Sequence, residues 1–152
     1  MSAHRYDTRL RWSGSTGLGW ESYDRVHLAT APPAEQEIRL TTGEAHGDPA
    51  VLNPEQLVVM AASSCQMLFF LHLASKARLD VVTYEDEASG VMPEDEEPLR
   101  ITAITLRPRI VLTGEAEEER VRKLVSLAHD HCYIANSLNA DMTIEPIIEF
   151  TA

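Results

Sequence analysis

The feature that most constrains this chain is a stretch of almost uninterrupted apolar residues near its middle. Residues 57–74 are about as long as a membrane span. Several polar residues and a cysteine interrupt the stretch, and no basic cluster precedes it, which argues against a span. These residues are Ser63, Ser64, Cys65, Gln66 and His72. A helix that is apolar on nearly every side is normally surrounded by protein, so we predict the buried central helix of the fold.

The start of this helix is well marked in the sequence. Asn53 can cap the helix through its side chain, and Pro54 suits the first helical position. Glu55 places a negative charge where the backbone dipole is positive. Helix-forming residues continue from there to about Arg78, so the predicted helix covers residues 53–78.

Strand patterns lie on both sides of the central helix. Apolar and polar residues alternate in the first of them, as they do in a half-buried strand. A second helix, with apolar residues on one face, is predicted for residues 115–131. The predicted strands are residues 6–12, 23–30, 37–40, 81–84, 99–112 and 142–150. This order predicts an α+β fold, with antiparallel sheets around a long central helix, rather than a repeat of βαβ units.

Length and charge limit the classes of function that fit this chain. A chain of 152 residues is the usual size for one domain, so we expect a single domain over residues 1–152. Its formal net charge of −11 argues against nucleic acid or an anionic membrane as a partner, because both need clustered Lys and Arg. The first residues lack the apolar core of a signal peptide, so we expect the protein to be cytoplasmic.

Cys65 and Cys132 are the residues from which chemistry is most readily expected. Cytoplasmic thiols are kept reduced, so a permanent disulfide is not expected. Two thiols that meet in space form a reversible pair, in which a sulfenic acid made by peroxide on one is resolved by the other. Free cysteines also pack as small apolar residues in protein cores. Spacing along the sequence does not decide between these two interpretations.

A reactive thiol at Cys65 needs a nearby positive charge, and the helix dipole does not supply it. Ten residues separate Glu55 from Cys65, which is about 15 Å along a helix, whereas the dipole acts within the first turn. An arginine beside the thiol would favour the thiolate. Arg25 and Arg39 in the N-terminal strands are the candidates, and each is equally consistent with an exposed strand residue.

A metal site is an alternative, because His129, His131 and Cys132 lie close together in the sequence. No CxxC or HExxH spacing supports it. Cys65 and His72 are about 10 Å apart along a helix, which is too far for a shared ion. Histidines at a helix C-terminus are also favoured by the dipole, so we expect no metal.

Several blocks of the sequence together resemble the OsmC/Ohr family of osmotically induced and organic-hydroperoxide-resistance proteins. The first cysteine block is residues 53–57 followed by residues 61–65 and a long apolar helix. The second is residues 127–132, leading into residues 136–138. The opening, residues 12–27, and the closing strand extend the resemblance over nearly the whole chain.

The resemblance implies an intertwined homodimer with two active sites at the subunit interface. It implies that Cys65 is the peroxidatic cysteine, that Cys132 is the resolving cysteine, and that Glu55 cooperates with an N-terminal arginine. Arg25 is favoured by its Tyr-x-Arg-x-His setting, and Arg39 is the next candidate. The implied substrates are organic and fatty-acid hydroperoxides, and the implied reductants are dithiols, often lipoylated proteins. No metal or flavin cofactor is implied.

One residue of the second cysteine block departs from the family pattern. A proline often follows the second cysteine in the family, whereas Tyr133 follows it here. The alternative function is a non-catalytic OsmC-like protein that binds a small molecule in an apolar interface pocket. A peroxide-consumption assay with a dithiol separates the two hypotheses.

Overall fold

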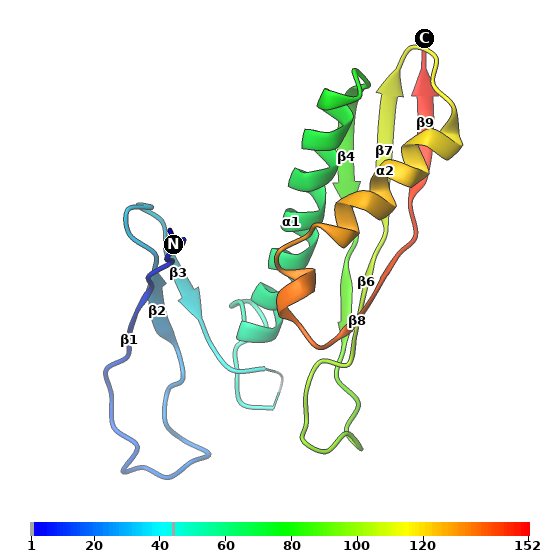
Figure 1. Ribbon diagram of the computed structural model, residues 1–152. Helices are drawn as coiled ribbons and strands as arrows, with labels where there is room; N and C mark the ends of the chain where they lie inside the picture. The colour runs from blue at the N-terminus through cyan, green and yellow to red at the C-terminus, as the bar shows by residue number, and fades with distance from the viewer. Residues whose placement is uncertain (1, 44) are drawn as a thin grey trace. The chain divides into compact units, whose positions relative to one another are not determined.

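The chain folds into two units, Met1–Leu57 and Val58–Ala152, and the computed structural model describes residues 2–43 and 45–152 (Figure 1). The first unit is an antiparallel sheet of β1 (Arg9–Arg11), β2 (His27–Thr30) and β3 (Glu37–Leu40), in that order. The predicted third strand is confirmed. The first two are shorter than predicted, because only four residues of β2 pair with β3 and three with β1.

Helix α1 (Pro54–Lys76) begins where the sequence predicts. The Asn53 side chain accepts a hydrogen bond from the Gln56 backbone N–H at 2.8 Å, and the Gln56 side chain accepts one from the Asn53 N–H at 3.0 Å. This reciprocal pair is a capping box, which satisfies backbone donors that the first turn leaves free. The helix is followed by Arg78, whose positive φ of 58° turns the chain toward the next strand.

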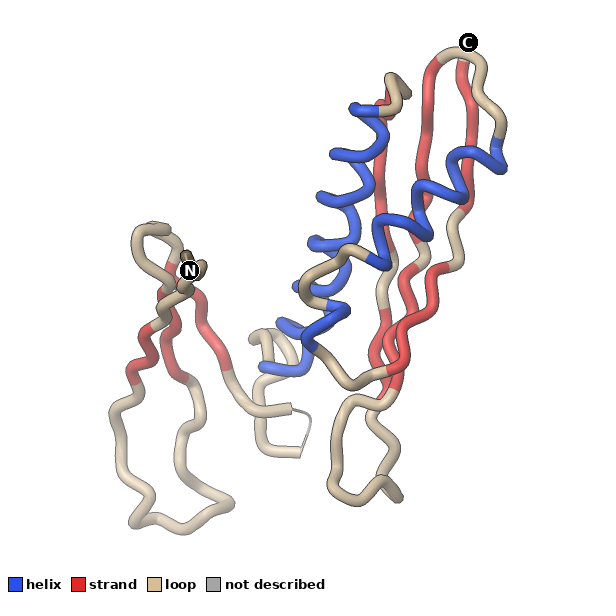
Figure 2. Tube along the Cα trace, in the orientation of Figure 1, coloured by secondary structure: helices blue, strands red, loops and turns tan. Residues whose placement is uncertain are grey.

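Strands of the second unit form two ladders with the same arrangement. One ladder has the order β4 (Asp80–Asp86), β7 (Pro108–Thr113), β9 (Ile147–Thr151). The other has the order β5 (Ser89–Val91), β6 (Ala103–Leu106), β8 (Asp141–Ile144). In each ladder the first two strands pair antiparallel and the last two pair parallel. Short breaks in the chain lead from β4 to β5, from β6 to β7 and from β8 to β9. Figure 2 shows the two ladders continuing one another as a long three-stranded surface.

Two helices supply the apolar side chains that cover this surface. Helix α2 (Glu118–Asp130) contributes Val121, Val125 and Ala128 to a buried cluster that includes Ile110 and Leu112 of β7. Helix α1 contributes further side chains to the same cluster. The 3₁₀ helix η1 (Ala135–Ser137) follows α2 after a short turn. The predicted α+β class is confirmed, whereas the sheets of the second unit are mixed rather than antiparallel, because β6–β8 and β7–β9 pair in parallel.

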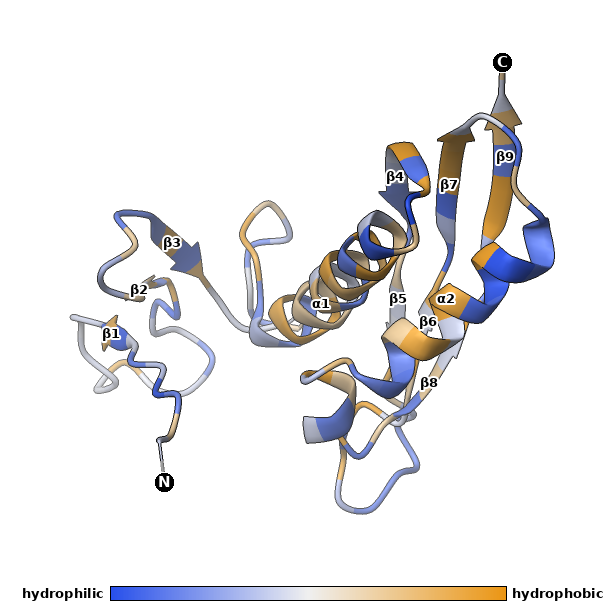
Figure 3. Ribbon diagram, turned by 45° about the horizontal axis from the view of Figure 1, so that its top comes forward, coloured by the Kyte–Doolittle hydropathy of each residue, from blue (hydrophilic) through white to orange (hydrophobic). Residues whose placement is uncertain are grey.

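The inner and outer sides of α1 differ in how well the chain covers them. By length and hydropathy α1 could cross a membrane, and apolar residues recur along it in Figure 3. The residues fully buried within the chain are Ala62, Gln66, Phe70 and Ala74. On other sides Met60 is 45% exposed and Leu68 is 60% exposed. A single chain therefore buries only one side of this helix, whereas the sequence predicted burial on nearly every side.

Candidate functional site

The two cysteines meet in the second unit, at the junction of its two helices. Cys65 lies on α1 and is half-buried, whereas Cys132 follows the last residues of α2 and is fully buried. Both thiols are free, and the Cys65 side chain lies near enough to Cys132 to help raise the pKa of the Cys132 thiol. The fold thus brings together two cysteines that are 67 positions apart in the sequence.

Burial is the main influence on the Cys132 thiol. Burial, together with a smaller contribution from the neighbouring Cys65 side chain, raises the pKa of Cys132 to about 11. The backbone N–H of Ala135 lies 3.5 Å from the Cys132 sulfur and acts in the opposite direction. Cys132 therefore remains a neutral thiol at neutral pH, which is the less reactive form.

A buried amide joins the two helices beside this pair, and the sequence analysis did not identify it. Gln66 follows Cys65 directly, is fully buried, and donates from Nε2 to the Val125 carbonyl of α2 at 3.0 Å. A hydrogen bond in a buried setting fixes the relative position of the elements that carry it. A polar residue inside an apolar run was the only sequence signal for this contact.

Arg25 and Glu55 line one hollow of about 380 Å³ in the first unit. The Arg25 guanidinium donates to the backbone carbonyls of Trp20 and Tyr23, and its Cζ lies 4.0 Å from the centre of the Tyr23 ring. The carbonyl of Arg25 in turn lies 2.9 Å from Nδ1 of His27, which lines the same hollow. Arg25 is therefore held in a defined position by the turn that precedes β2.

Arg39 has a different setting from Arg25. It lies on β3 opposite Leu28, is exposed, and does not line the hollow that holds Glu55. Among the salt bridges of residues 2–43 and 45–152, none joins Glu55 to either arginine. The hollow brings Arg25 and Glu55 to one place, and it leaves Arg39 outside.

A second hollow, of about 540 Å³, lies along the side of α1 that carries Ser63 and Met67. The Ser63 hydroxyl donates to Asp86 there at 2.5 Å, and burial together with the Asp86 carboxylate raises the pKa of Tyr84. Cys65 follows Ser63 by two residues, which places the two side chains about 200° apart around the helix. This hollow is therefore separate from the cysteine pair.

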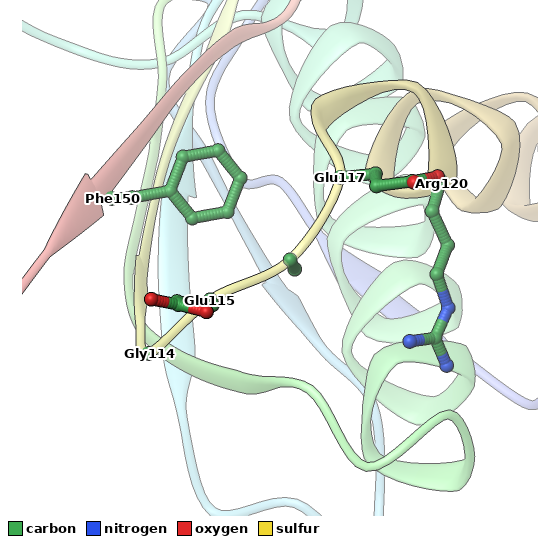
Figure 4. Close-up of a pocket in the computed structure, with 6 residues that line it drawn as sticks. Gly114, Glu115, Glu117, Arg120 and Phe150 are labelled. Carbon is green, nitrogen blue, oxygen red and sulfur yellow. The ribbon is translucent and has the colours of Figure 1, made fainter.

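A further hollow, of about 670 Å³, lies where β7 leads into α2 (Figure 4). Glu115, Glu117 and Phe150 line it, and Arg120 also donates to the Ala77 carbonyl at 2.8 Å. It contains neither cysteine nor any other residue that the sequence analysis selected. No group of three His, Cys, Asp or Glu side chains suited to a metal ion occurs among the residues that the structure describes.

The fold and the cysteine pair together define a class of protein. A long apolar helix and a second helix pack on a mixed sheet, and one thiol from each helical region meets the other between them. The chain belongs to the OsmC-like protein family, whose model matches residues 46–146. The family resemblance seen in the sequence is thereby confirmed. A comparison with curated proteins finds no match.

Solved structures with the same fold cover nearly the whole chain. An OsmC-like protein of unknown function from Vibrio cholerae is 27% identical, with a TM-score of 0.86 over 95% of this chain and 100% of that one. An organic hydroperoxide resistance protein OsmC from Legionella pneumophila is 14% identical, with a TM-score of 0.65 and all of both chains covered. The organic hydroperoxide resistance protein OhrB of Bacillus subtilis is 17% identical, with a TM-score of 0.60 over 95% and 98% of the two chains.

Proposed function

We propose that this protein is a thiol peroxidase that reduces organic hydroperoxides through Cys65 and Cys132. The observation that carries the proposal is the proximity of these two free thiols, one half-buried on α1 and one fully buried after α2. Two thiols in contact can form and release a disulfide without a large movement of the chain. The hydroperoxide resistance proteins among the structural neighbours support the same type of chemistry.

The reaction has two steps within the protein. In the first, the Cys65 thiolate attacks the terminal oxygen of the hydroperoxide, an S–O bond forms, and the O–O bond breaks. The departing alkoxide takes a proton and leaves as an alcohol. In the second, the Cys132 sulfur attacks the sulfenic acid on Cys65, the S–S bond forms, and the oxygen leaves as water. An external dithiol then reduces the disulfide.

The different environments of the two thiols support this division of roles. Cys65 is partly open to the surroundings, so a substrate can approach it, whereas Cys132 is 0% exposed. The raised pKa of Cys132 keeps it protonated while Cys65 reacts. The residues one turn away from Cys65 on α1, such as Ala61, Leu68 and Phe69, are apolar, which suits a hydroperoxide with an apolar organic group rather than a highly charged substrate.

Glu55 and an arginine are proposed to complete the site from a second copy of the chain. Glu55 and Cys65 lie on the same continuous helix, ten residues apart, which is about 15 Å along its axis. A carboxylate alone would raise the pKa of the thiol, so Glu55 serves to orient the arginine that stabilises the thiolate. We expect Arg25→Ala to slow peroxide reduction more than Arg39→Ala, because Arg25 shares its hollow with Glu55.

The cellular setting follows from the chemistry of the proposed cycle. The reductant is a dithiol, for which a lipoylated protein is the leading candidate, and the two thiols need no metal or flavin. A cytoplasmic location would supply such reductants and keep the resting thiols reduced. The substrate is proposed to be an organic or fatty-acid hydroperoxide, and the role to be defence against oxidative stress.

Mass spectrometry after addition of cumene hydroperoxide tests the proposal. We expect the wild-type chain to lose two hydrogens, and Cys132→Ser to gain oxygen on Cys65 after about one equivalent of peroxide, because no thiol resolves it. Cys65→Ser should not react in the first step. Ser75→Ala, an exposed change on the same helix, is the matched control and should behave as wild type. Oxygen added to Cys132 instead, or no oxidation of either thiol, would contradict the proposed roles.

A further inference from the structure

A pair of aromatic rings connects the same two segments as the cysteine pair. The Phe69 and Tyr133 ring centres are 4.9 Å apart, and the ring planes meet at 89°. This is the edge-to-face arrangement that aromatic rings prefer, and it adds attraction beyond the area that it buries. Tyr133 is nevertheless 70% exposed, so burial alone does not explain its position.

Each ring of the aromatic pair lies next to one of the two cysteines. Phe69 follows Cys65 by four residues on α1, so the two side chains lie on the same side of the helix, one turn apart. Tyr133 follows Cys132 directly in the chain. The two contacts are thus neighbouring links between α1 and the segment that follows α2.

The segment that carries Cys132 is also held by bonds within itself. Ser137 donates from its hydroxyl to the Tyr133 carbonyl at 2.7 Å, and Asn136 donates from its side chain to the Asp130 carbonyl at 3.1 Å. These bonds shape the turn, but both of their partners belong to the same short stretch of chain. On its inner side the segment packs through Ile134 against the buried cluster around Ala62. The Tyr133 ring provides the corresponding contact on the exposed side.

We propose that Tyr133 is a positioning residue that holds Cys132 against Cys65 through its contact with Phe69. The proposal rests on the proposed function of the cysteine pair and adds a residue to it. A disulfide forms only while the segment is docked on α1, so its formation scales with the docked fraction. Loss of the Tyr133 ring lowers that fraction and leaves the Cys65 sulfur itself unchanged.

Equilibrium with glutathione measures this positioning without any peroxide. The protein dithiol and oxidised glutathione exchange to give the protein disulfide and two molecules of reduced glutathione, so the equilibrium constant reports how well the two thiols are placed. We expect Tyr133→Ala to lower this constant by roughly two- to tenfold, the range that one aromatic pair represents. Tyr133→Phe keeps the ring and should restore the wild-type value. Tyr6→Ala, at another exposed tyrosine in the first unit, is the control.

A second measurement follows the effect into the proposed reaction. With cumene hydroperoxide, Tyr133→Ala should form the sulfenic acid on Cys65 at the wild-type rate but resolve it more slowly. The fraction of Cys65 that is oxidised further to sulfinic acid should therefore rise by a similar factor, because the sulfenic acid persists longer. A merely structural role would change the first step as well.

The outcomes distinguish the two proposals from one another. An unchanged glutathione equilibrium in Tyr133→Ala, or an equal fall in Tyr133→Phe, overturns the positioning role. A wild-type protein that forms the disulfide with glutathione but does not reduce cumene hydroperoxide overturns the peroxidase proposal, and the glutathione result then still decides the role of Tyr133. A wild-type protein that forms no Cys65–Cys132 disulfide at any glutathione ratio overturns both.

Discussion

At the residue scale, the properties of Cys132 follow from where its sulfur lies. The side chain is fully buried at the end of α2, and its backbone N–H donates to the His129 carbonyl at 3.1 Å. Because charge is disfavoured in such a position, the thiol holds its proton more tightly than a thiol in an unfolded chain. A group that gains or loses a proton on unfolding makes stability depend on pH.

We therefore expect the reduced protein to lose stability as the pH rises from about 9 to about 11. In this window the Cys132 thiol, whose pKa is raised from 9.0 to about 11, is ionised in the unfolded chain and still protonated in the folded one. The measurement is the free energy of unfolding in urea across this range, with a reductant present. Cys132→Ser is the control, because it keeps every other titrating group and should show a smaller fall. Equal falls in the two proteins would contradict the raised pKa.

At the element scale, α1 is positioned by its first turn as well as by its apolar side. Asn53 and Gln56 exchange hydrogen bonds there, and Glu55 adds a negative charge at the positive end of the dipole. The same turn places Glu55 beside the hollow of Arg25. The start of the helix thus serves both the stability of the element and the position of a proposed site residue.

Asn53→Ala should lower the free energy of unfolding by about 1 kcal/mol, the usual effect of losing an N-terminal cap. The reason is that the Gln56 N–H loses the acceptor that it has at 2.8 Å. Chemical denaturation followed by circular dichroism measures the change. Asn139→Ala, at an exposed asparagine outside the helices, is the matched control and should have little effect. A loss no larger than that of the control would show that the cap does not stabilise the protein.

At the scale of the whole molecule, we propose that a second copy of the chain covers the exposed side of α1. Met60 and Leu68 are 45% and 60% exposed on a helix with a high proportion of apolar residues. A chain that left this surface open would expose an apolar patch of the kind that marks association. In the proposed dimer, Glu55 and Arg25 of one copy are expected to complete the cysteine site of the other.

Light scattering should therefore give a mass near 34 kDa, which is about twice the 16.9 kDa of one chain. Leu68→Glu should shift the mass toward that of the monomer, because a charge on the apolar side of α1 opposes burial. Leu18→Glu places the same charge at a residue that is 76% exposed in the first unit, and it should leave the dimer intact. A monomeric mass for the wild-type protein at micromolar concentration would contradict the dimer.

Local signals in the sequence predicted that a helix or strand is present more reliably than they predicted its first and last residues. The cap at Asn53, the apolar run and the strand at residues 37–40 were recognised because each depends on neighbouring residues only. The strands predicted at residues 6–12 and 23–30 are shorter in the structure, because a strand extends only as far as its partner pairs with it. The single domain over residues 1–152 stays a prediction.

By itself, the sequence determined the α+β class, the family, the central helix and the two cysteines as candidates for chemistry. It did so because periodicity, caps and motif blocks are properties of short stretches of chain. Only the tertiary structure decided that Cys132 is buried against Cys65 and that Gln66 joins the two helices. The contact of Tyr133 with Phe69 was decided there as well. These contacts join residues far apart in the sequence, and no local pattern specifies which distant side chain will face which other once the core has packed.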